Sequence, residues 1–565
     1  MALRTALLRA AALGLAAALA VLALTLLLRG GGVGALGLLQ GLAVMVATFW
    51  LGFGTALVLL GIGAPAPRRE ERPFQGRAVV LIPICNEDAS PIFAGIVAMD
   101  ADLRAEGIWR DVDIAVLSDT RNAGLAAEEE RLFRRLLEET GDDGRLFYRR
   151  RTDNRGRKAG NIEEFVRRSG GAYEYAVILD ADSLMSGQTI ATMLNRMEAD
   201  PRLGLLQTVP FVIGARSRFG RMMAFAGAFH GPIFARGLSR LQGRTGPFWG
   251  HNAAVRVRAF AESCGLPELS GPPPFGGHVL SHDYVEAALL ARAGWTVRLD
   301  PDIGGSYEEA PQNIVAYAKR DRRWCQGNLQ HARILLAPGF RPWSRFVFAQ
   351  GIFAYLVPLF WLSFVLLGLL GRGEARGTAA LAILVVVLLL GPKLLVVLLS
   401  ARRARAFGGR RLLLGSVAAE VVQSSVIAPI LLMFQARSVL QVLMGRDGGW
   451  PAQARGDMGL TWADGWRSSW WITVWGLGLM ALATVLAPAL LPWLLPLAVP
   501  MALAPLVITW TSRPPRSFLF ATPEEIAPPA ILRRAEAERR RWDAPEAAPL
   551  APAARPAMPQ QVHHA

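Results

Sequence analysis

Two carboxylates, Asp180 and Asp182, follow directly after the apolar run 175–179. Residues two apart in an extended segment point the same way, so their oxygens can converge on one hard cation such as Mg²⁺ or Mn²⁺. A solvated turn is the alternative for an isolated pair. The preceding strand, and a third acid, Asp119, at the end of a neighbouring strand, favour the metal. A divalent cation bound here would neutralise a diphosphate.

Asp119 could also accept hydrogen bonds from a uracil or a ribose, although helix capping is the commoner role of an Asp at such a turn. Lys158 lies where a helix should begin, in Arg157-Lys158-Ala159-Gly160-Asn161. The positive end of that helix would favour a phosphate together with the lysine. Nearby arginines at 149–151 and 155 make this edge electropositive. Lys158 is therefore a predicted phosphate ligand, with a surface lysine as the alternative.

Asp283 opens a predicted helix that runs to about residue 292. Helix capping is one interpretation. The other is a general base, because a transfer with inversion needs a carboxylate to take the proton from an acceptor hydroxyl. Farther along, Arg323 and Trp324 end the basic run 319–324. An arginine can pair with a diphosphate and a tryptophan can stack on a sugar, whereas both residue types also suit a membrane surface.

The elements that must position these residues alternate between strand and helix. Helices are predicted at 90–106, 124–139, 158–168 and 187–199, between strands at 77–83, 112–118, 146–149, 176–180 and 204–208. This alternation predicts an α/β domain with a mostly parallel sheet. Ligands in such sheets bind at the carboxyl ends of the strands. The polar residues that follow strand ends are Asn86, Glu87, Asp119, Asp180 and Asp182.

Apolar stretches flank this domain on both sides. Those at 10–28 and 34–62 can each span a bilayer, and their close succession favours a helical hairpin over a cleaved leader. Further spans are predicted at 345–370, 377–400, 470–490 and 492–512. The segment 411–444 contains polar residues and is predicted to lie at the membrane interface, with a full span as the alternative. About six spans result, and seven or eight remain open.

The chain is 52% hydrophobic and carries a formal net charge of +16. So basic a chain invites a nucleic-acid partner. Much of the excess arginine, however, lies beside apolar stretches at 402–411 and 513–541, as expected for cytoplasmic loops next to anionic lipid. The lipid bilayer is therefore the expected partner and nucleic acid is not. Three widely spaced cysteines argue against a disulfide scaffold and fit a reducing compartment.

Taken in order, these residues resemble the processive branch of the family-2 glycosyltransferases, whose signature is D, DxD, D and QxxRW. The matches are Asp119, then Asp180 with Asp182, then Asp283, and Arg323 with Trp324. The Pro83-x-x-Asn86-Glu87 turn is similar to the family's nucleotide-binding first loop. The resemblance covers about residues 75–335. It implies a GT-A-type domain that transfers a sugar with inversion from a nucleotide sugar.

Two positions depart from the family pattern. Arg320 stands where the family has Gln, and Ser281-His282-Asp283 where it has Thr-Glu-Asp. With the runs at 248–252 and 324–328, these departures resemble the glucosyltransferases of osmoregulated periplasmic glucans rather than cellulose synthase. That resemblance implies UDP-glucose as donor, a growing β-1,2-linked glucan as product, and the inner membrane of a Gram-negative bacterium.

The same resemblance implies a role for each matching residue. The base is Asp283 and the metal ligands are Asp180 and Asp182. Contacts to the nucleotide sugar are implied at Asn86, Glu87, Asp119, Lys158, Asp180 and Arg323. Contacts to the acceptor are implied at Trp324, Trp249, His251 and His282. A loop at 445–466 occupies the place of the gating loop of cellulose synthase, with an ordinary connector as an equal alternative; it includes Trp450, Gln453, Arg455 and Trp462.

The expected fold is thus a GT-A-type α/β domain inserted between transmembrane helices, with interfacial helices. Its expected parts are an N-terminal transmembrane hairpin (1–66), a cytoplasmic glycosyltransferase domain (67–342), transmembrane helices (343–400), an interfacial helix with a possible gating loop (401–469), transmembrane helices (470–512), and a basic, then Ala/Pro-rich, cytoplasmic tail (513–565). Three alternatives stay open: synthesis of another polysaccharide such as cellulose or hyaluronan, transfer to a lipid carrier, and a membrane-anchored nucleotide-sugar sensor without turnover. A need for acyl carrier protein as a partner is also open.

Overall fold

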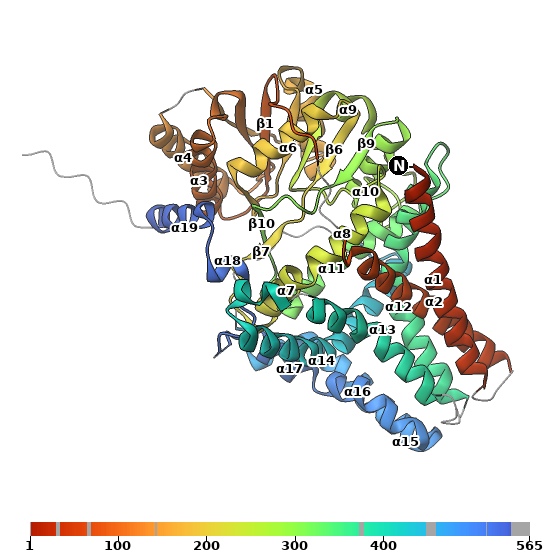
Figure 1. Ribbon diagram of the computed structural model, residues 1–565. Coiled ribbons are helices and arrows are strands. Elements are labelled where there is room, and N and C mark those ends of the chain that lie inside the picture. Colours follow the sequence, from red (N-terminus) through yellow and green to blue (C-terminus); the bar gives the residue numbers. More distant parts are fainter. Residues whose placement is uncertain are drawn as a thin grey trace, which may run out of the picture.

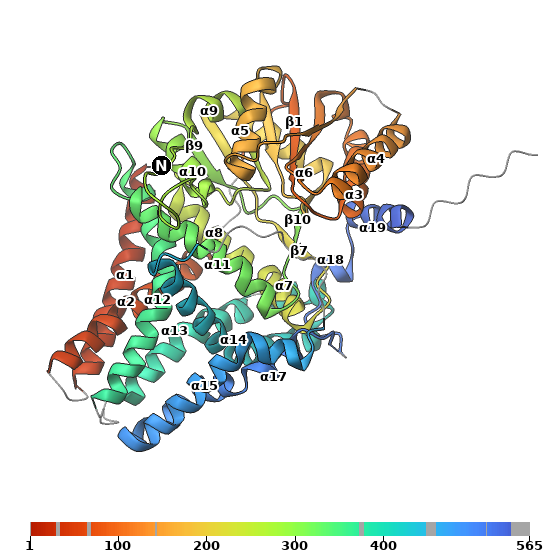
Figure 2. The ribbon, with the colours of Figure 1, turned by 180° about the vertical axis from the view of Figure 1, so that it is seen from behind.

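The structure is a computed structural model in which an α/β domain lies on one side of a bundle of long apolar helices (Figures 1 and 2). It describes residues 2–29, 34–64, 69–141, 144–371, 378–399, 401–447, 459–515 and 517–543. The chain enters the domain from the antiparallel helices α1 (Ala2–Arg29) and α2 (Ala35–Gly61) and leaves it through α12 (Pro342–Leu370). The domain is therefore inserted between apolar helices, as the sequence predicts.

A seven-stranded sheet forms the centre of this domain, in the order β3-β2-β1-β4-β8-β6-β9. Strand β8 is antiparallel to both of its neighbours and the other pairs are parallel. The strands are β1 (Ala78–Ile84), β2 (Val112–Ser118), β3 (Leu146–Arg150), β4 (Tyr175–Ile178), β6 (Leu203–Gln207), β8 (Ala253–Arg256) and β9 (Thr296–Leu299). A smaller sheet pairs β5 (Leu184–Met185) and β7 (Phe211–Ile213) with β10 (Ser306–Glu309). The predicted, mostly parallel sheet is confirmed.

Successive residues of β1 point to opposite faces of the sheet, so they enter two different cores. Val80 and Ile82 pack with α3 (Ala89–Ala105), α4 (Ala123–Thr140), α6 (Gly187–Ala199) and the C-terminal helix α19 (Ala530–Asp543). Val79 and Leu81 pack with α5 (Arg157–Ser169), α9 (Val257–Ser263) and α10 (His282–Arg292). A strand covered on both faces needs a continuous apolar run, which explains the sequence Ala-Val-Val-Leu-Ile-Pro-Ile of β1.

Three shorter helices lie between the sheet and the long apolar helices (Figure 1): α7 (Arg218–Phe229), α8 (Gly231–Gln242) and α11 (Ile314–Gln330). Helix α8 packs against α2 at two glycines. A side chain at Gly61 would collide with the carbonyl of Ile233, and one at Gly237 with the carbonyl of Leu57. The two backbones are in direct contact there, which only glycine allows.

Six helices in the described part of the chain are long and apolar enough to cross a membrane: α1, α2, α12, α13 (Thr378–Leu399), α14 (Arg410–Leu443) and α15 (Trp462–Leu486). The segment 488–511 instead holds a helix pair bent by 60°, which includes α16 (Leu491–Ala502) and α17 (Ala504–Thr511). These six helices, or seven spans if the bent pair crosses as one, agree with the expected count of about six, but the membership differs from the prediction. Helix α14 qualifies by length and composition, and its interfacial placement stays a prediction.

The C-terminal helix α19 returns to the α/β domain and docks on α3 and α4, as both views show (Figures 1 and 2). Trp542 stacks on Phe93 at 6.3 Å between ring centroids, and Arg541 pairs with Glu139 at 2.7 Å. The basic part of the predicted tail therefore contains an ordered, packed helix. It follows the short helix α18 (Pro523–Ile526), and 3₁₀ turns occur at Trp109–Asp111, Gly170–Ala172, His331–Arg333, Ala401–Phe407 and Pro488–Leu490. The Ala/Pro-rich end lies outside the described residues.

Candidate active site

Asp180 and Asp182 lie in a turn between β4 and β5. The Asp180 backbone N–H donates to Ser183 Oγ at 3.0 Å, and the Ser183 N–H donates back to the Asp180 carbonyl at 3.0 Å. This turn, rather than the pleat of an extended strand, sets the directions of the two carboxylates. The extended geometry expected from the sequence is wrong in that respect. Their place beyond the carboxyl end of a buried strand is as expected.

Lys158 joins this turn to a second segment. Its ammonium group donates to the Asp180 carboxylate and, at 2.8 Å, to the carbonyl of Gly250. Lys158 is in the first turn of α5, after Gly156 in the left-handed conformation (φ 68°). A side chain at Gly160 would collide with the Arg155 carbonyl, so this glycine lets the loop fold back on the helix. The Lys-Ala-Gly run therefore aims Lys158 at the acidic turn.

Asp283 reaches the same glycine from a third segment. A Cβ placed on Gly250 would lie 3.6 Å from Asp283 Cβ and 3.8 Å from its Oδ2. Gly250 thus has Lys158 on its carbonyl and Asp283 beside its Cα. Burial raises the pKa of the Asp283 carboxyl above its ordinary value. The predicted base, the predicted phosphate ligand and the first acid of the predicted metal pair are therefore brought together.

Helix α11 adds positive charge to this site. Arg320 and Arg323 are three residues apart and so share one face of the helix. Burial lowers the pKa of Arg323 to about 10, and the neighbouring charges of Arg320 and Arg157 act in the same direction. Arg320 also lies over the ring of Trp324 at 4.4 Å. The Arg that replaces the family's Gln is thus part of a cationic cluster beside Asp180.

A third acid, Glu308 at the end of β10, was missed by sequence reasoning. Its Oε2 lies 3.5 Å from His251 Nε2. Burial raises the pKa of Glu308, the charges of His251 and Arg320 oppose this rise, and those of Asp182 and Asp180 add to it. His251, which precedes β8, is therefore close to Glu308, an acid whose charge interacts with the predicted metal pair Asp180 and Asp182. No local pattern marks Glu308, because β10 belongs to the small second sheet.

A divalent cation fits the donor set at Asp180 and Asp182. Within the described ranges, no group of three or more His, Cys, Asp and Glu side chains is arranged to hold a metal. Mg²⁺, however, keeps several waters and is usually bound by one or two carboxylates together with substrate phosphates. The Asp180 side chain is 37% exposed and so accessible to such a ligand. The pair suits a cation shared with a diphosphate rather than one enclosed by protein.

Asn86 links the loop that follows β1 to the loop that follows β2. It adopts a positive φ of 55°, its N–H donates to Thr120 Oγ1 at 2.8 Å, and its Oδ1 accepts from the N–H groups of Arg121 and Asn122 at 3.1 Å. Its side-chain oxygen therefore fixes the backbone just before the N-terminus of α4. Glu87 follows it and is partly exposed. Both residues lie at the expected sheet edge, and their contacts to a nucleotide stay predictions.

Asp119 is held in a buried ion pair. It is 5% exposed, accepts from Arg151 Nη2 at 2.8 Å, and accepts from Asn161 Nδ2 at 3.0 Å. Asn161 also donates to the Leu117 carbonyl at 3.1 Å. A contact between Asp119 and a uracil would require the Arg151 pair to open. Sequence reasoning counted Arg151 only as part of a basic edge and missed its partner.

The remaining predicted acceptor residues lie at different depths. Trp249 packs with apolar residues of α1, α2 and α12, and its backbone N–H donates to Gln207 Oε1 at 3.0 Å. His282 Nδ1 lies 3.0 Å from Glu286 Oε2, one turn along α10. Trp324 is 38% exposed. Of this set, Trp324 presents an accessible aromatic face, whereas Trp249 helps to join the domain to the membrane helices.

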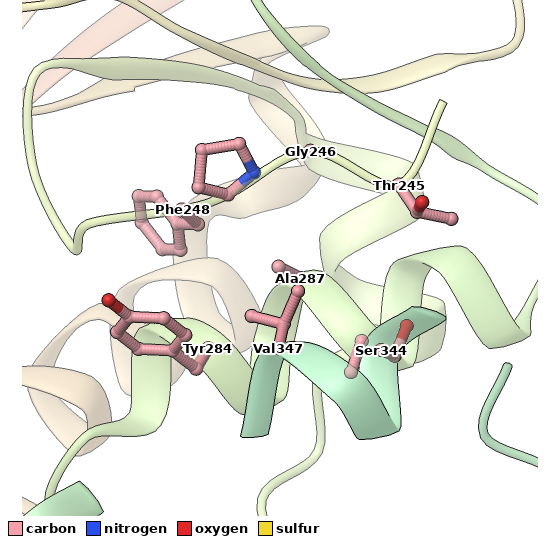
Figure 3. A pocket seen from close by; sticks show the side chains of 9 residues that line it. Thr245, Gly246, Phe248, Tyr284, Ala287, Ser344 and Val347 are labelled. Carbon is pink, nitrogen blue, oxygen red and sulfur yellow. The ribbon is translucent and has the colours of Figure 1, made fainter. Parts of the chain in front are cut away.

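Helix α10 also packs against α12, the first helix after the α/β domain. A small cavity lies between the loop at Gly246–Phe248, Tyr284 and Ala287 of α10, and Ser344 and Val347 of α12 (Figure 3). Its lining contains no charged side chain. It is therefore a packing gap between α10 and α12. This packing couples the position of Asp283 to α12.

Half of the predicted gating loop, residues 448–458 with Trp450, Gln453 and Arg455, falls outside the described residues. Trp462 lies in α15, because a capping box between Thr461 and Asp464 starts that helix earlier than hydropathy indicates. On the other side of the gap, Asp447 accepts from Gln326 of α11 at 2.7 Å, and Arg322 donates to the Arg446 carbonyl at 2.7 Å. The first residues of the predicted loop are thus docked on the helix that carries Arg323.

Two protein-family models match the chain. The model described as glycosyl transferase family 2 matches residues 79–263, and glycosyl transferase family group 2 matches residues 175–399. Together they cover the α/β domain and the first two helices after it. This agrees with the GT-A-type α/β domain inserted between apolar helices that the sequence predicts.

Curated relatives extend the match to most of the chain. The chain is 54% identical over 554 residues to glucans biosynthesis glucosyltransferase H of Cereibacter sphaeroides, covering 92% of both chains. It is 38% identical to the protein of that name from Caulobacter vibrioides, covering 84% of this chain and 76% of the relative. Among solved structures, a mannosyltransferase from Pyrobaculum calidifontis in complex with GDP-Man and Mn²⁺ covers 71% of this chain and 99% of its own, with 18% identity and a TM-score of 0.45.

Proposed function

The chain belongs to the family-2 glycosyltransferases, among the glucans biosynthesis glucosyltransferase H proteins, and on that premise we propose that it polymerises glucose from UDP-glucose. The product is the β-1,2-linked backbone of osmoregulated periplasmic glucans. Transfer takes place at the cytoplasmic face of the inner membrane, and the growing glucan passes across that membrane.

One observation carries this proposal. Lys158 of α5, Asp180 after β4 and Asp283 of α10 come from three different elements, yet Lys158 contacts both Asp180 and the Gly250 carbonyl, and Asp283 lies beside Gly250. A phosphate ligand, a carboxylate suited to a cation and a buried carboxylate suited to proton transfer are the groups that glycosyl transfer from a nucleoside diphosphate requires. A protein that only binds a nucleotide sugar has no use for the buried base.

Each group has one task in the reaction. Asp283 takes the proton of the acceptor hydroxyl while that oxygen attacks the anomeric carbon of the donor. The bond from the anomeric carbon to the diphosphate oxygen breaks on the opposite face, so the configuration inverts. Lys158 and Arg323 hold the departing diphosphate by charge-assisted hydrogen bonds. Asp180 and Asp182 would hold a divalent cation, which would further neutralise that leaving group.

The acceptor end is placed by the exposed ring of Trp324, on which a sugar can stack. Trp324 belongs to α11, the helix that also carries Arg323. His251 and His282 flank the same site and are assigned to acceptor hydroxyls. Trp249, which is packed against the membrane helices, supports the loop that carries Gly250 and His251.

The C-terminal helix supports the cytoplasmic orientation. Because α19 docks on α3, the arginines of 530–543 lie on the same side of the apolar helices as the α/β domain. Arginine-rich segments next to spans favour the cytoplasmic side. UDP-sugars are made in that compartment, so donor and active site would share it.

Purified protein in proteoliposomes, supplied with radiolabelled UDP-glucose and Mg²⁺, tests the proposal. We expect a polymer whose glucose residues are joined by β-1,2 linkages, with release of one UDP per glucose added. Parallel reactions with UDP-galactose, UDP-N-acetylglucosamine and GDP-mannose should give far less product. A polymer with β-1,4 linkages, or nucleotide binding with no turnover of any donor, would overturn this assignment.

A further inference from the structure

A buried carboxylate, Glu286, stands one helical turn after the base on α10. Its Oε2 lies 3.0 Å from His282 Nδ1, and the two side chains are 4% and 13% exposed. A carboxylate can only accept a hydrogen bond, so Nδ1 of His282 carries the proton in this contact. His282 is also the neighbour of Asp283 in the motif where the sequence departs from its family. Glu286 has no other role in the reaction derived above.

We propose that Glu286 is a positioning residue that holds His282 as an imidazolium beside Asp283, so that the buried base stays deprotonated while it waits for the acceptor. The arrangement places two negative groups on either side of one positive group along the first turns of α10. This inference rests on Asp283 being the base of the proposed transfer. It adds a role for Glu286 and His282, which together keep the Asp283 carboxylate ionised.

The electrostatics of the cluster agree with this arrangement. Burial acts to lower the pKa of His282, but the carboxylates of Glu286 and Asp283 raise it above its ordinary value despite Lys158 of α5. Burial raises the pKa of Asp283, and the His282 charge opposes this rise more strongly than Glu286 adds to it. Taken together, the charges of His282 and Glu286 therefore favour the ionised form of Asp283.

The other titratable groups around α10 do not replace His282. His331 faces the Ser281 carbonyl at 3.0 Å, and burial lowers its pKa to about 4, so it is neutral. The Cys264 thiol lies 3.7 Å from the Glu286 carbonyl, and burial raises its pKa, so it is neutral as well. The pKa of Tyr284 is also raised by burial. Among the described residues around Asp283, His282 is therefore the group that supplies adjacent positive charge on this helix.

A cavity of about 260 Å³ offers a matched control. It lies between α5, α9 and α10 and is lined by Glu286 on one side and by Glu163 and Arg167 on the other. Glu163 lines the same cavity, and no hydrogen bond or ion pair joins it to His282 in the described chain. A Glu163→Gln variant therefore removes a carboxylate from the same cavity without touching the base. Glu163 is exposed whereas Glu286 is buried, so this variant controls for the loss of a carboxylate that lines the cavity and not for burial.

The test is the pH dependence of glucan synthesis by full-length protein in proteoliposomes, measured for wild type, His282→Gln, Glu286→Gln and Glu163→Gln. Activity rises with pH as Asp283 loses its proton. His282→Gln removes the positive charge and keeps Glu286, so its acid limb should move to higher pH by about one unit. Glu286→Gln leaves a neutral imidazole and should move the limb in the same direction by less. Glu163→Gln should leave the limb in place.

A fifth variant, His282→Lys, keeps a cation at this position. We expect its acid limb to lie close to that of wild type, a rescue that a purely structural histidine would not give. It also provides the test if Glu286→Gln does not fold. Unmoved limbs in His282→Gln and Glu286→Gln, or failure of His282→Lys to restore the limb, would overturn the inference. Such results leave the transferase assignment intact, whereas absence of any donor turnover by wild type would refute the assignment itself.

Discussion

Replacing Gly327 with alanine should separate the two helices on which catalysis depends. Gly327 of α11 faces Ser281, the residue before His282 and Asp283. A Cβ at Gly327 would collide with Ser281 Oγ and would lie 2.7 Å from the Ser281 backbone nitrogen and 3.0 Å from its Cβ. Ordinary contacts begin at 3.4 Å, so α10 and α11 must move apart by about 0.7 Å. Such overpacking costs about 1–3 kcal/mol.

The effect on catalysis should be larger than the effect on stability. A misplacement near 1 Å lowers rates by about 10²-fold, so we expect kcat for Gly327→Ala to fall on the order of 10- to 100-fold. UDP affinity should change less, because Lys158 is on α5 and only the proposed Arg323 contact moves with α11. The matched control is Gly227→Ala in α7, where an added Cβ meets nothing within 4 Å. Initial rates of glucan synthesis and thermal unfolding should be measured for both. A Gly327→Ala variant with the kcat of wild type would refute the coupling of the two helices.

Other changes test separate parts of the site. Chelation by EDTA should abolish synthesis and added Mg²⁺ or Mn²⁺ should restore it; full activity in metal-free buffer would contradict the roles of Asp180 and Asp182. Lys158→Met should weaken UDP binding about 10- to 100-fold, since it removes charge-assisted hydrogen bonds; calorimetry with UDP checks this, and unchanged affinity would exclude Lys158 from the donor site. Trp542→Ala should destabilise the docked C-terminal helix by about 3 kcal/mol and expose it to protease; equal protease resistance in the variant and wild type would show that the docking of α19 does not depend on this side chain.

The order of the main strands and helices between residues 77 and 208 could be predicted because their boundaries are marked locally, whereas β7, β8, β9 and β10 were not predicted. The expected strand at 112–118 matches β2 at both ends, since its apolar run stops where Asp119 begins. Helices α4 and α6 start after Asn122 and Ser186, whose side chains accept hydrogen bonds from Leu125 and Thr189. Local capping and apolar pattern therefore suffice for the element order and for the sheet edge that carries the site.

The partners within the site could not be predicted, because they come from segments far apart in the sequence. Nothing in the local sequence indicates that Lys158 donates to the Gly250 carbonyl, that Arg151 covers Asp119, or that Glu308 stands beside the acidic turn. The Gly250 contact depends on β8 lying next to β4, the Arg151 contact on β3 lying next to β2, and Glu308 comes from a separate sheet. The strand order in turn depends on tertiary packing, which local patterns do not specify.

The membrane region was harder to divide than the α/β domain. Hydropathy places the start of α15 at about 470, but the capping box at Thr461 begins the helix at Trp462. Composition alone gave the tail as basic. A signal for its docked helix was present, since Ile531 and Trp542 are eleven residues apart, close to three helical turns, and both are buried. A charged helix with two large apolar residues on one face is expected to pack that face against another element.

The most direct test of the proposed mechanism is Asp283→Asn, assayed for glucan synthesis and for UDP binding on the same preparation. Because burial disfavours the ionised carboxyl of Asp283, the neutral amide should leave thermal stability at neutral pH unchanged or higher. Loss of synthesis with UDP affinity retained is the result that an Asp283 base predicts. Glucan synthesis at the wild-type rate in this variant would contradict it.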